Sequence, residues 1–178
     1  DCPTDGASPR VRLTQSTFQP PGPALEKRMW TIPVCVSAYG LTGSPVRSCT
    51  IMTEAAATVS LFGACPAFIS ANADGAGYYR VAMDERGWTS ALAGFRRLST
   101  GEKIALMDSM RAGFATGKTT AALVLRSIEA GAASTDPAVR SKAVDVAASL
   151  APLARDEAEQ RAYATWVRTT FAKRGDAG

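Results

Sequence analysis

The pattern of apolar and polar positions changes character once along the chain, near residue 84. Before that point, short runs rich in β-branched and aromatic residues are separated by Gly, Pro, Asn and Asp. In the clearest run, Trp30, Ile32 and Val34 alternate with other residues, which is typical of a strand that buries one face. Pro33 lies in this run and cannot donate a ladder hydrogen bond, so we expect a sheet edge or a bulge there. The strand-like runs are residues 11–15, 30–36, 46–52, 57–61 and 77–81.

After residue 84 the breakers become sparse and the apolar residues recur at helical spacing. Ser99 and Glu102 form a capping-box pattern, which predicts a helix start. Asp136 followed by Pro137 predicts another, because Asp is a good N-cap and Pro is tolerated in the first turn. The helices are expected near residues 88–98, 99–117, 121–130, 136–150 and 156–173.

These helices are connected by short loops, which favour antiparallel neighbours. The sequence therefore predicts a β-then-α chain: an antiparallel β-sandwich over residues 1–83, then an α-helical segment of antiparallel, solenoid-like hairpins over residues 84–178. The expected buried faces comprise Ile104, Met107, Met110 or Ala112, and Phe114 in one helix, Val139, Ala143, Val146 and Leu150 in the next, and Ala162, Trp166 and Tyr163 in the last.

Composition agrees with a folded protein and narrows the set of partners. Of the 178 residues, 46% are hydrophobic and 20% are charged, which is an ordinary globular balance. The net charge of +4 comes from scattered basic residues, which argues against a nucleic-acid partner. No apolar run approaches the roughly 18 residues of a membrane span. Residues 1–10 lack the pattern of a signal peptide. A mature secreted form or an excised segment would lack this pattern too.

The four cysteines suggest an oxidising compartment. Cys35 and Cys49 flank a turn-rich stretch, and in a hairpin centred on Thr42 they would lie opposite each other. Opposed residues can approach to about 4.5 Å between Cα atoms, within the reach of a disulfide. Reduced core cysteines are the alternative. Cys2 and Cys65 are candidates for a second disulfide, and none of the four has a zinc-site spacing.

Catalytic motifs are missing or incomplete. The chain contains no histidine, which removes the usual base of serine and cysteine hydrolases and the H-E-x-x-H zinc motif. Residues 113–119 look like a phosphate-binding loop but have three residues between the glycines instead of four, and they follow a helical run. We interpret them as a turn between helices. The sequence thus predicts no catalytic, cofactor-binding or metal-binding residue.

Residues 72–84 carry a more specific pattern: Asn72, then the run Gly-Tyr-Tyr-Arg-Val at 77–81, then Asp84. With the strand-like stretches 13–18 and 30–34 upstream, and Trp88 and residues 98–108 downstream, this order resembles the aminopeptidase N family of zinc metallopeptidases. The resemblance covers roughly residues 9–125. Met83 departs from it, because a tyrosine is common at that position in the family.

The resemblance implies a β-sandwich that follows a catalytic domain, and the first part of a helical C-terminal domain that would continue beyond Gly178. Zinc in that family belongs to the catalytic domain, so no zinc ligand is carried over to this chain. Arg80 is expected to pair with a carboxylate or to cap a helix carbonyl at the junction. Tyr78 or Tyr79 is expected to pack in the sandwich.

The leading hypothesis is a non-catalytic fragment of an exported aminopeptidase that removes N-terminal residues from peptides. The fragment would be a spacer and a wall of the active-site chamber. Its partners would be the catalytic domain of the same polypeptide and, through that domain, peptide substrates. The expected location is the bacterial periplasm or the extracellular space. A stand-alone protein- or peptide-binding module is the alternative, and an independent hydrolase is the third class.

Overall fold

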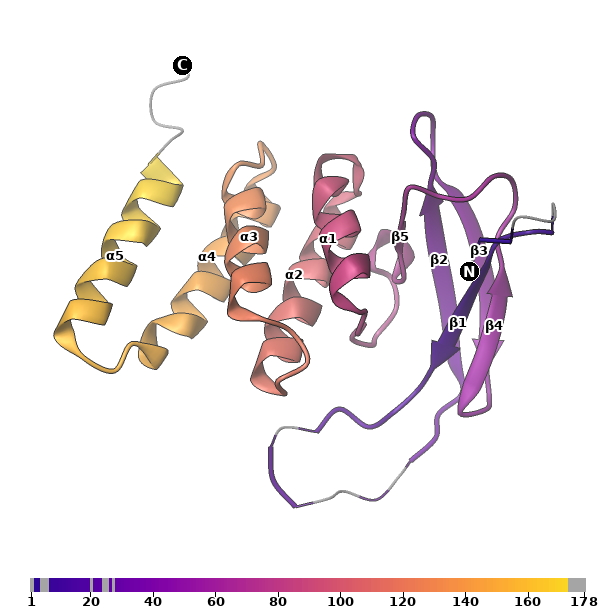
Figure 1. Cartoon of the computed structure of the whole chain (residues 1–178), viewed down its shortest axis with the longest axis horizontal. Helices are drawn as coiled ribbons and strands as arrows, with labels where there is room; N and C mark the ends of the chain where they lie inside the picture. Colours follow the sequence, from indigo (N-terminus) through magenta and orange to yellow (C-terminus); the bar gives the residue numbers. More distant parts are fainter. Residues whose placement is uncertain (1, 4–6, 20, 24–25, 27, 173–178) are drawn as a thin grey trace.

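All strands precede all α-helices in the described part of the chain, as the change in pattern near residue 84 predicts (Figure 1). The computed structural model describes residues 2–3, 7–19, 21–23, 26 and 28–172. We call residues 7–70 the β-segment, residues 71–84 the junction segment and residues 85–172 the helical segment. The β-segment lies at one end of the molecule, and α5 (Glu157–Ala172) lies at the other end, with the remaining helices between them (Figure 1).

The β-segment consists of two small antiparallel sheets. In one, β1 (Arg10–Thr14) pairs with β4 (Ala56–Ser60). In the other, β2 (Ile32–Tyr39) lies between β3 (Val46–Met52) and β5 (Phe68–Ser70). Because β5 pairs only with residues 37–39, Pro33 lies where β2 has β3 as its single described neighbour. This position satisfies the expectation that proline lies at an edge.

One apolar cluster joins the two sheets. Val34, Val36 and Met52 of the larger sheet are buried against Val59 and Leu61, which lie in and just after β4. Every second residue of β2 contributes to this cluster from Val34 onward, as the period of a pleated strand requires. The apolar residues of the predicted strands therefore provide the core of the β-segment.

The predicted strand at residues 77–81 is wrong. Those residues form bends without a strand, and the last strand of the β-segment is instead β5. The reason is that side chains satisfy the backbone there: Asn72 bonds both the N–H and the carbonyl of Gly77, and Ser109 accepts from Val81 N. A β-rich composition alone does not create a ladder when no neighbouring strand supplies partners.

The helices expected from residues 99, 121, 136 and 156 begin within one residue of those positions, whereas the first helix begins at Glu85 instead of near residue 88. The side chains of Asp84, Ser99, Thr120 and Asp136 each accept a hydrogen bond from a backbone N–H in the first turn of the following helix. The helices are α1 (Glu85–Ala93), α2 (Thr100–Ala115), α3 (Ala121–Ala132), α4 (Pro137–Leu150) and α5 (Glu157–Ala172), with the 3₁₀ turns η1 (Ala73–Gly75), η2 (Phe95–Arg97) and η3 (Ala151–Leu153). The first helix ends at Ala93 instead of near residue 98, with Gly94 as its C-cap, and position 173 of the last lies outside the described residues.

The helical core follows the predicted faces with a few differences. Met107, Met110, Val139, Ala143 and Val146 are buried. The expected burial of Ala162 is wrong: this residue is exposed, because α5 is the end helix of the described stack and has no buried residue. Other members of the predicted faces that are only half-buried are Ile104, Phe114, Leu150, Tyr163 and Trp166.

Two aromatic residues of the β-segment belong to the helical core. Tyr39 at the end of β2 and Phe68 at the start of β5 are buried in the same cluster as Trp88 and Phe95. Their rings stack, with centroids 4.5 Å apart. The two segments therefore share apolar packing and are not joined by a free linker.

The capping box of α2 provides a stability test. Replacing Ser99 with Ala removes the acceptor for Glu102 N, and we expect the free energy of unfolding to fall by about 1 kcal/mol. Urea denaturation followed by circular dichroism measures the change. Ser141→Ala, an exposed substitution inside α4, is the matched control and should change stability by less than about 0.5 kcal/mol. Equal effects of the two substitutions would contradict the importance of the cap.

Candidate functional site

The junction segment begins with a turn that is closed by one side chain. Asn72 is 5% exposed, and its carboxamide accepts from Gly77 N at 2.8 Å and donates to Gly77 O at 3.0 Å. Within this turn Asp74 adopts a left-handed conformation, with φ of 56°, which Asp tolerates better than most residues. The asparagine of the family-like pattern therefore has a structural role, since it shapes the turn that leads into Tyr78.

The three predicted junction residues point to different surroundings. Tyr78 is fully exposed. Tyr79 packs against the apolar cluster of the β-segment, and its hydroxyl donates to Ala71 O at 3.0 Å. Burial raises the pKa of the Tyr79 phenol. Arg80 Nε donates to Asp108 Oδ2 at 3.0 Å, and its guanidinium lies 5.0 Å from the centroid of the Phe18 ring.

Asp108 connects the junction segment to two helices. It lies on α2, accepts from Arg80, and also accepts from Lys142 Nζ of α4 at 2.8 Å. Partial burial raises the pKa of Asp108, but the hydrogen bond and charge of Lys142, with those of Arg80, outweigh burial and lower it below the usual value. The next residue, Ser109, accepts from Val81 N at 3.1 Å. Two adjacent residues of α2, Asp108 and Ser109, thus bind the junction segment, and Asp108 also binds α4.

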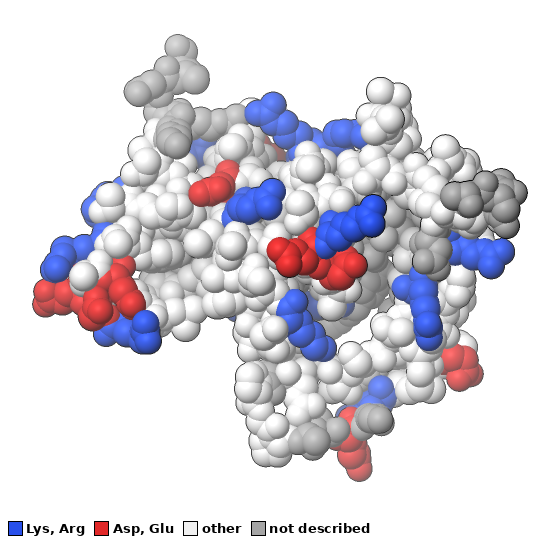
Figure 2. Space-filling view, in the orientation of Figure 1, with Lys and Arg blue, Asp and Glu red and all other residues white. Residues whose placement is uncertain are grey.

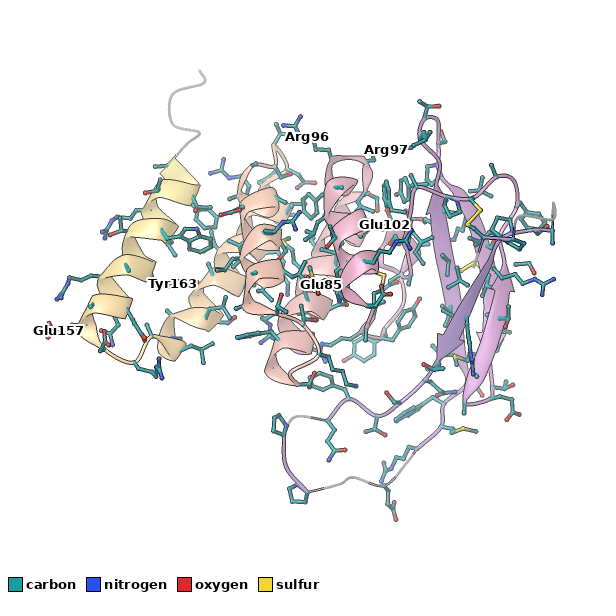
Figure 3. All side chains as sticks on the ribbon, viewed as in Figure 1. Glu85, Arg96, Arg97, Glu102, Glu157 and Tyr163 are labelled. Atoms are coloured by element: carbon teal, nitrogen blue, oxygen red, sulfur yellow. A yellow bond between two sulfur atoms is a disulfide. The ribbon has the colours of Figure 1, made fainter. Side chains whose placement is uncertain are left out.

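A second connection lies deeper, between β2 and α2. Glu102 is 2% exposed, and its Oε2 accepts from Ser99 N at 3.0 Å and from the Tyr39 hydroxyl. Burial, followed by the hydrogen bond to the Glu102 carboxylate and its charge, raises the pKa of Tyr39 strongly. Figure 3 shows Glu102 on the side of the helical segment that faces β2.

Arg97 holds the hairpin between β2 and β3 against the helical segment. Its guanidinium donates to the carbonyls of Gly40, Leu41 and Gly43. It also lies 5.5 Å from the centroid of the Tyr39 ring, a cation–π geometry. Figure 3 places Arg97 next to this hairpin, at the top of the view. Arg97 therefore packs on the aromatic pair of Tyr39 and Phe68, and Glu102 accepts a hydrogen bond from the Tyr39 hydroxyl.

The turn η1 is in close backbone contact with the start of α2. A Cβ atom added at Gly101 would lie 1.9 Å from Asp74 O, and one added at Gly75 would lie 2.4 Å from Gly101 O. Gly75 also has a left-handed φ of 67°. Both positions therefore require glycine, which explains the glycine inside the capping-box sequence.

Both candidate disulfides are formed. Cys35 and Cys49 are in register on β2 and β3, with Cα atoms 4.0 Å apart. Cys2 and Cys65 are joined as well, with Cα atoms 5.7 Å apart. The structure therefore has the oxidised pairs in place of the reduced core cysteines considered as the alternative.

The other sequence motifs make no chemical site in the described residues. Residues 113–115 are the end of α2, and residues 116–119 belong to the turn that leads to α3, in which Lys118 N donates to Gly113 O and Gly117 has a φ of 71°. Within the described ranges, no group of three or more Cys, Asp or Glu side chains is arranged to hold a metal ion. The same residues include no helix with the length and apolar character needed to traverse a bilayer.

Charges of both signs are mixed on the surface. In Figure 2, Lys and Arg side chains lie beside Asp and Glu side chains over the helical segment. This face carries no continuous basic stripe of the kind that follows a nucleic-acid backbone.

No protein-family model and no curated protein matches this sequence. The resemblance to aminopeptidases consequently rests on the motifs at residues 13–18, 30–34 and 72–108. Sequence reasoning singled out Arg80 but missed its partners Asp108 and Lys142. A signal was present for Asp108, because the residues four positions before and after it on the helix, Ile104 and Ala112, are apolar.

The ion pairs of Asp108 predict a defined pH dependence. Its pKa in the folded protein lies below the value of about 3.9 for an unfolded chain. Its contribution to stability is therefore fully present above that value and is lost as the pH falls through the lower pKa of the folded state. We expect Asp108→Asn to reduce the free energy of unfolding by about 1 kcal/mol at pH 7, and by progressively less below pH of about 4.

Denaturant titrations between pH 7 and pH 2.5 would measure this convergence. Asp145→Asn on the exposed side of α4 is the matched control, with an expected change within about 0.5 kcal/mol at pH 7. A difference between wild type and Asp108→Asn that stays constant as the pH falls would show that Asp108 acts through packing and not through its charge.

Proposed function

We propose that this chain is a non-catalytic part of a zinc aminopeptidase, in which it holds a sandwich-like spacer against the helices that wall the active-site chamber. The observation that supports the proposal is that four residues of the family-like pattern make structural contacts at the junction. Asn72 closes the turn, Tyr79 packs on the β-segment, Arg80 pairs with Asp108, and Asp84 caps α1. All four make architectural contacts.

The way in which the two segments are joined supports a rigid spacer. Tyr39 and Phe68 place β-segment side chains within the helical core, and Glu102 bonds Tyr39 from the helical side. A buried, hydrogen-bonded carboxylate fixes the geometry of its partners more tightly than an exposed ion pair. A chamber wall needs this property, because its position relative to a catalytic domain must not vary.

Export of the parent protein is part of the same proposal. Both disulfides lie in the β-segment or bind it to the N-terminal residues, and disulfides persist in oxidising compartments. We propose the periplasm or the extracellular space as the location. Zinc and the peptide-cleaving groups would be supplied by a catalytic domain of the same polypeptide.

A stand-alone binding module is the second candidate, and the exposed apolar side chains favour it. Most of the large apolar side chains that are exposed among the described residues lie in the β-segment or the junction segment, including Ile51, Phe62 and Tyr78 at 67%, 69% and 108% exposure. Such side chains mark a protein interface when they are contiguous. A catalytic domain would cover them in the first proposal, and a separate protein or peptide would do so in the second.

The encoding gene distinguishes these two candidates. The first proposal predicts an open reading frame that continues upstream of Asp1 and encodes H-E-x-x-H followed by a further glutamate. Sequencing the gene with its flanking DNA is the measurement. A start codon and a signal peptide directly before Asp1 would exclude the fragment and leave the binding module.

Enzyme assays test the non-catalytic role directly. We expect the 178-residue chain, supplied with zinc and a panel of aminoacyl anilides, to show no turnover above a chain-free control. The reason is that it contains no histidine for the zinc-binding motif. A known aminopeptidase under the same conditions provides the positive control. Turnover that co-purifies with the chain and disappears after chelation would reveal an independent hydrolase.

A further inference from the structure

A small cavity lies where the junction segment meets α1 and α2. Its volume is about 20 Å³, and its polar lining comes from Ser70, Asn72, Trp88, Glu102 and Ser109. The rest of the wall is largely apolar, with Val81 and Leu106 among its members. The cavity therefore combines a largely apolar wall with a few polar groups contributed by different elements.

Two residues that line this cavity each have a buried polar atom with no hydrogen-bond partner in the protein. They are Nε1 of Trp88 and Oε1 of Glu102, and both residues are 2% exposed. The other oxygen of Glu102 already accepts from Tyr39 and Ser99, which fixes the orientation of the carboxylate. Buried polar groups in folded proteins nearly always have a partner, either from the protein or from ordered water.

The chemistry of these two atoms selects the missing partner. An indole N–H only donates, and a carboxylate oxygen only accepts, so the partner must accept from one and donate to the other. A cation would face the positive end of the indole N–H, and an anion would face the carboxylate. A cavity must offer about 10–15 Å³ to hold one water, and this cavity is only slightly larger.

We propose that this cavity is a binding site for a single structural water molecule. The water accepts a hydrogen bond from Trp88 Nε1 and donates one to Glu102 Oε1, and the Ser109 hydroxyl offers it a third contact. It thereby joins α1 and α2 beside the junction segment. The proposal concerns hydration of the junction and is independent of the aminopeptidase assignment, so either can fail without the other.

Nuclear magnetic resonance of the 178-residue chain in solution tests this site. The chain has three tryptophans, so the indole N–H signals are few and Trp88 can be assigned by triple-resonance methods, without a variant that has to fold. We expect a cross peak between the Trp88 indole proton and water, with the sign that indicates a long-lived buried water. Trp166, whose Nε1 donates directly to Glu129 Oε1 at 3.3 Å, is the matched control and should lack such a peak.

A crystal structure in which ordered waters are visible provides the second measurement. Electron density for one water within hydrogen-bonding distance of both Trp88 Nε1 and Glu102 Oε1 would support the proposal. A direct hydrogen bond between these two atoms, with no density between them, would overturn it. The lack of a long-lived water peak at the Trp88 indole proton in solution would overturn it equally.

Discussion

The arrangement of the two segments depends on one buried carboxylate. Glu102 Oε2 accepts the hydrogen bond from Ser99 N that completes the capping box of α2, and the same oxygen accepts a hydrogen bond from the Tyr39 hydroxyl. Burying a charge is costly unless hydrogen bonds compensate for lost hydration, so the start of α2 and the end of β2 must keep their relative positions. Because the Tyr39 ring stacks on Phe68, β5 is held as well. One side chain thus relates a helix terminus to two strands.

The remaining contacts between the two segments are of a different kind. Arg97 covers the aromatic pair from solvent, and the Asp108 ion pairs lie in a partly exposed layer. Exposed ion pairs contribute little to stability, typically about 0–1 kcal/mol, but they orient their partners. The close approach of Gly101 to Asp74 adds a steric limit, since neither backbone can move toward the other. Buried polar contacts, apolar packing and backbone contact therefore all fix the position of the helical segment relative to the rest of the chain.

Local signals were sufficient for much of the fold. Ser99 and Asp136 marked helix starts correctly because a cap depends on residues within one turn. The strands β1 to β4 followed from β-type runs between breakers, with clear alternation in the run at residues 30–36, whereas the three-residue β5 is too short to show a period. Residues 77–81 have strand-like composition, but Asn72 and Ser109 satisfy their backbone, and this is visible only in three dimensions. The burial of Glu102 was equally hidden, since a capping glutamate is usually solvated.

The disulfide between Cys2 and Cys65 has a topological consequence. It spans 63 positions and encloses the other disulfide as well as β1 to β4, so this part of the β-segment lies in two nested covalent rings, and β5 lies outside them. The helical segment lies outside both rings. Tension applied between the two ends of the chain would pass across the outer disulfide directly to residue 65 and onward into the junction. Under mechanical load, the strands enclosed by the outer ring would therefore be shielded, and the helices would extend first.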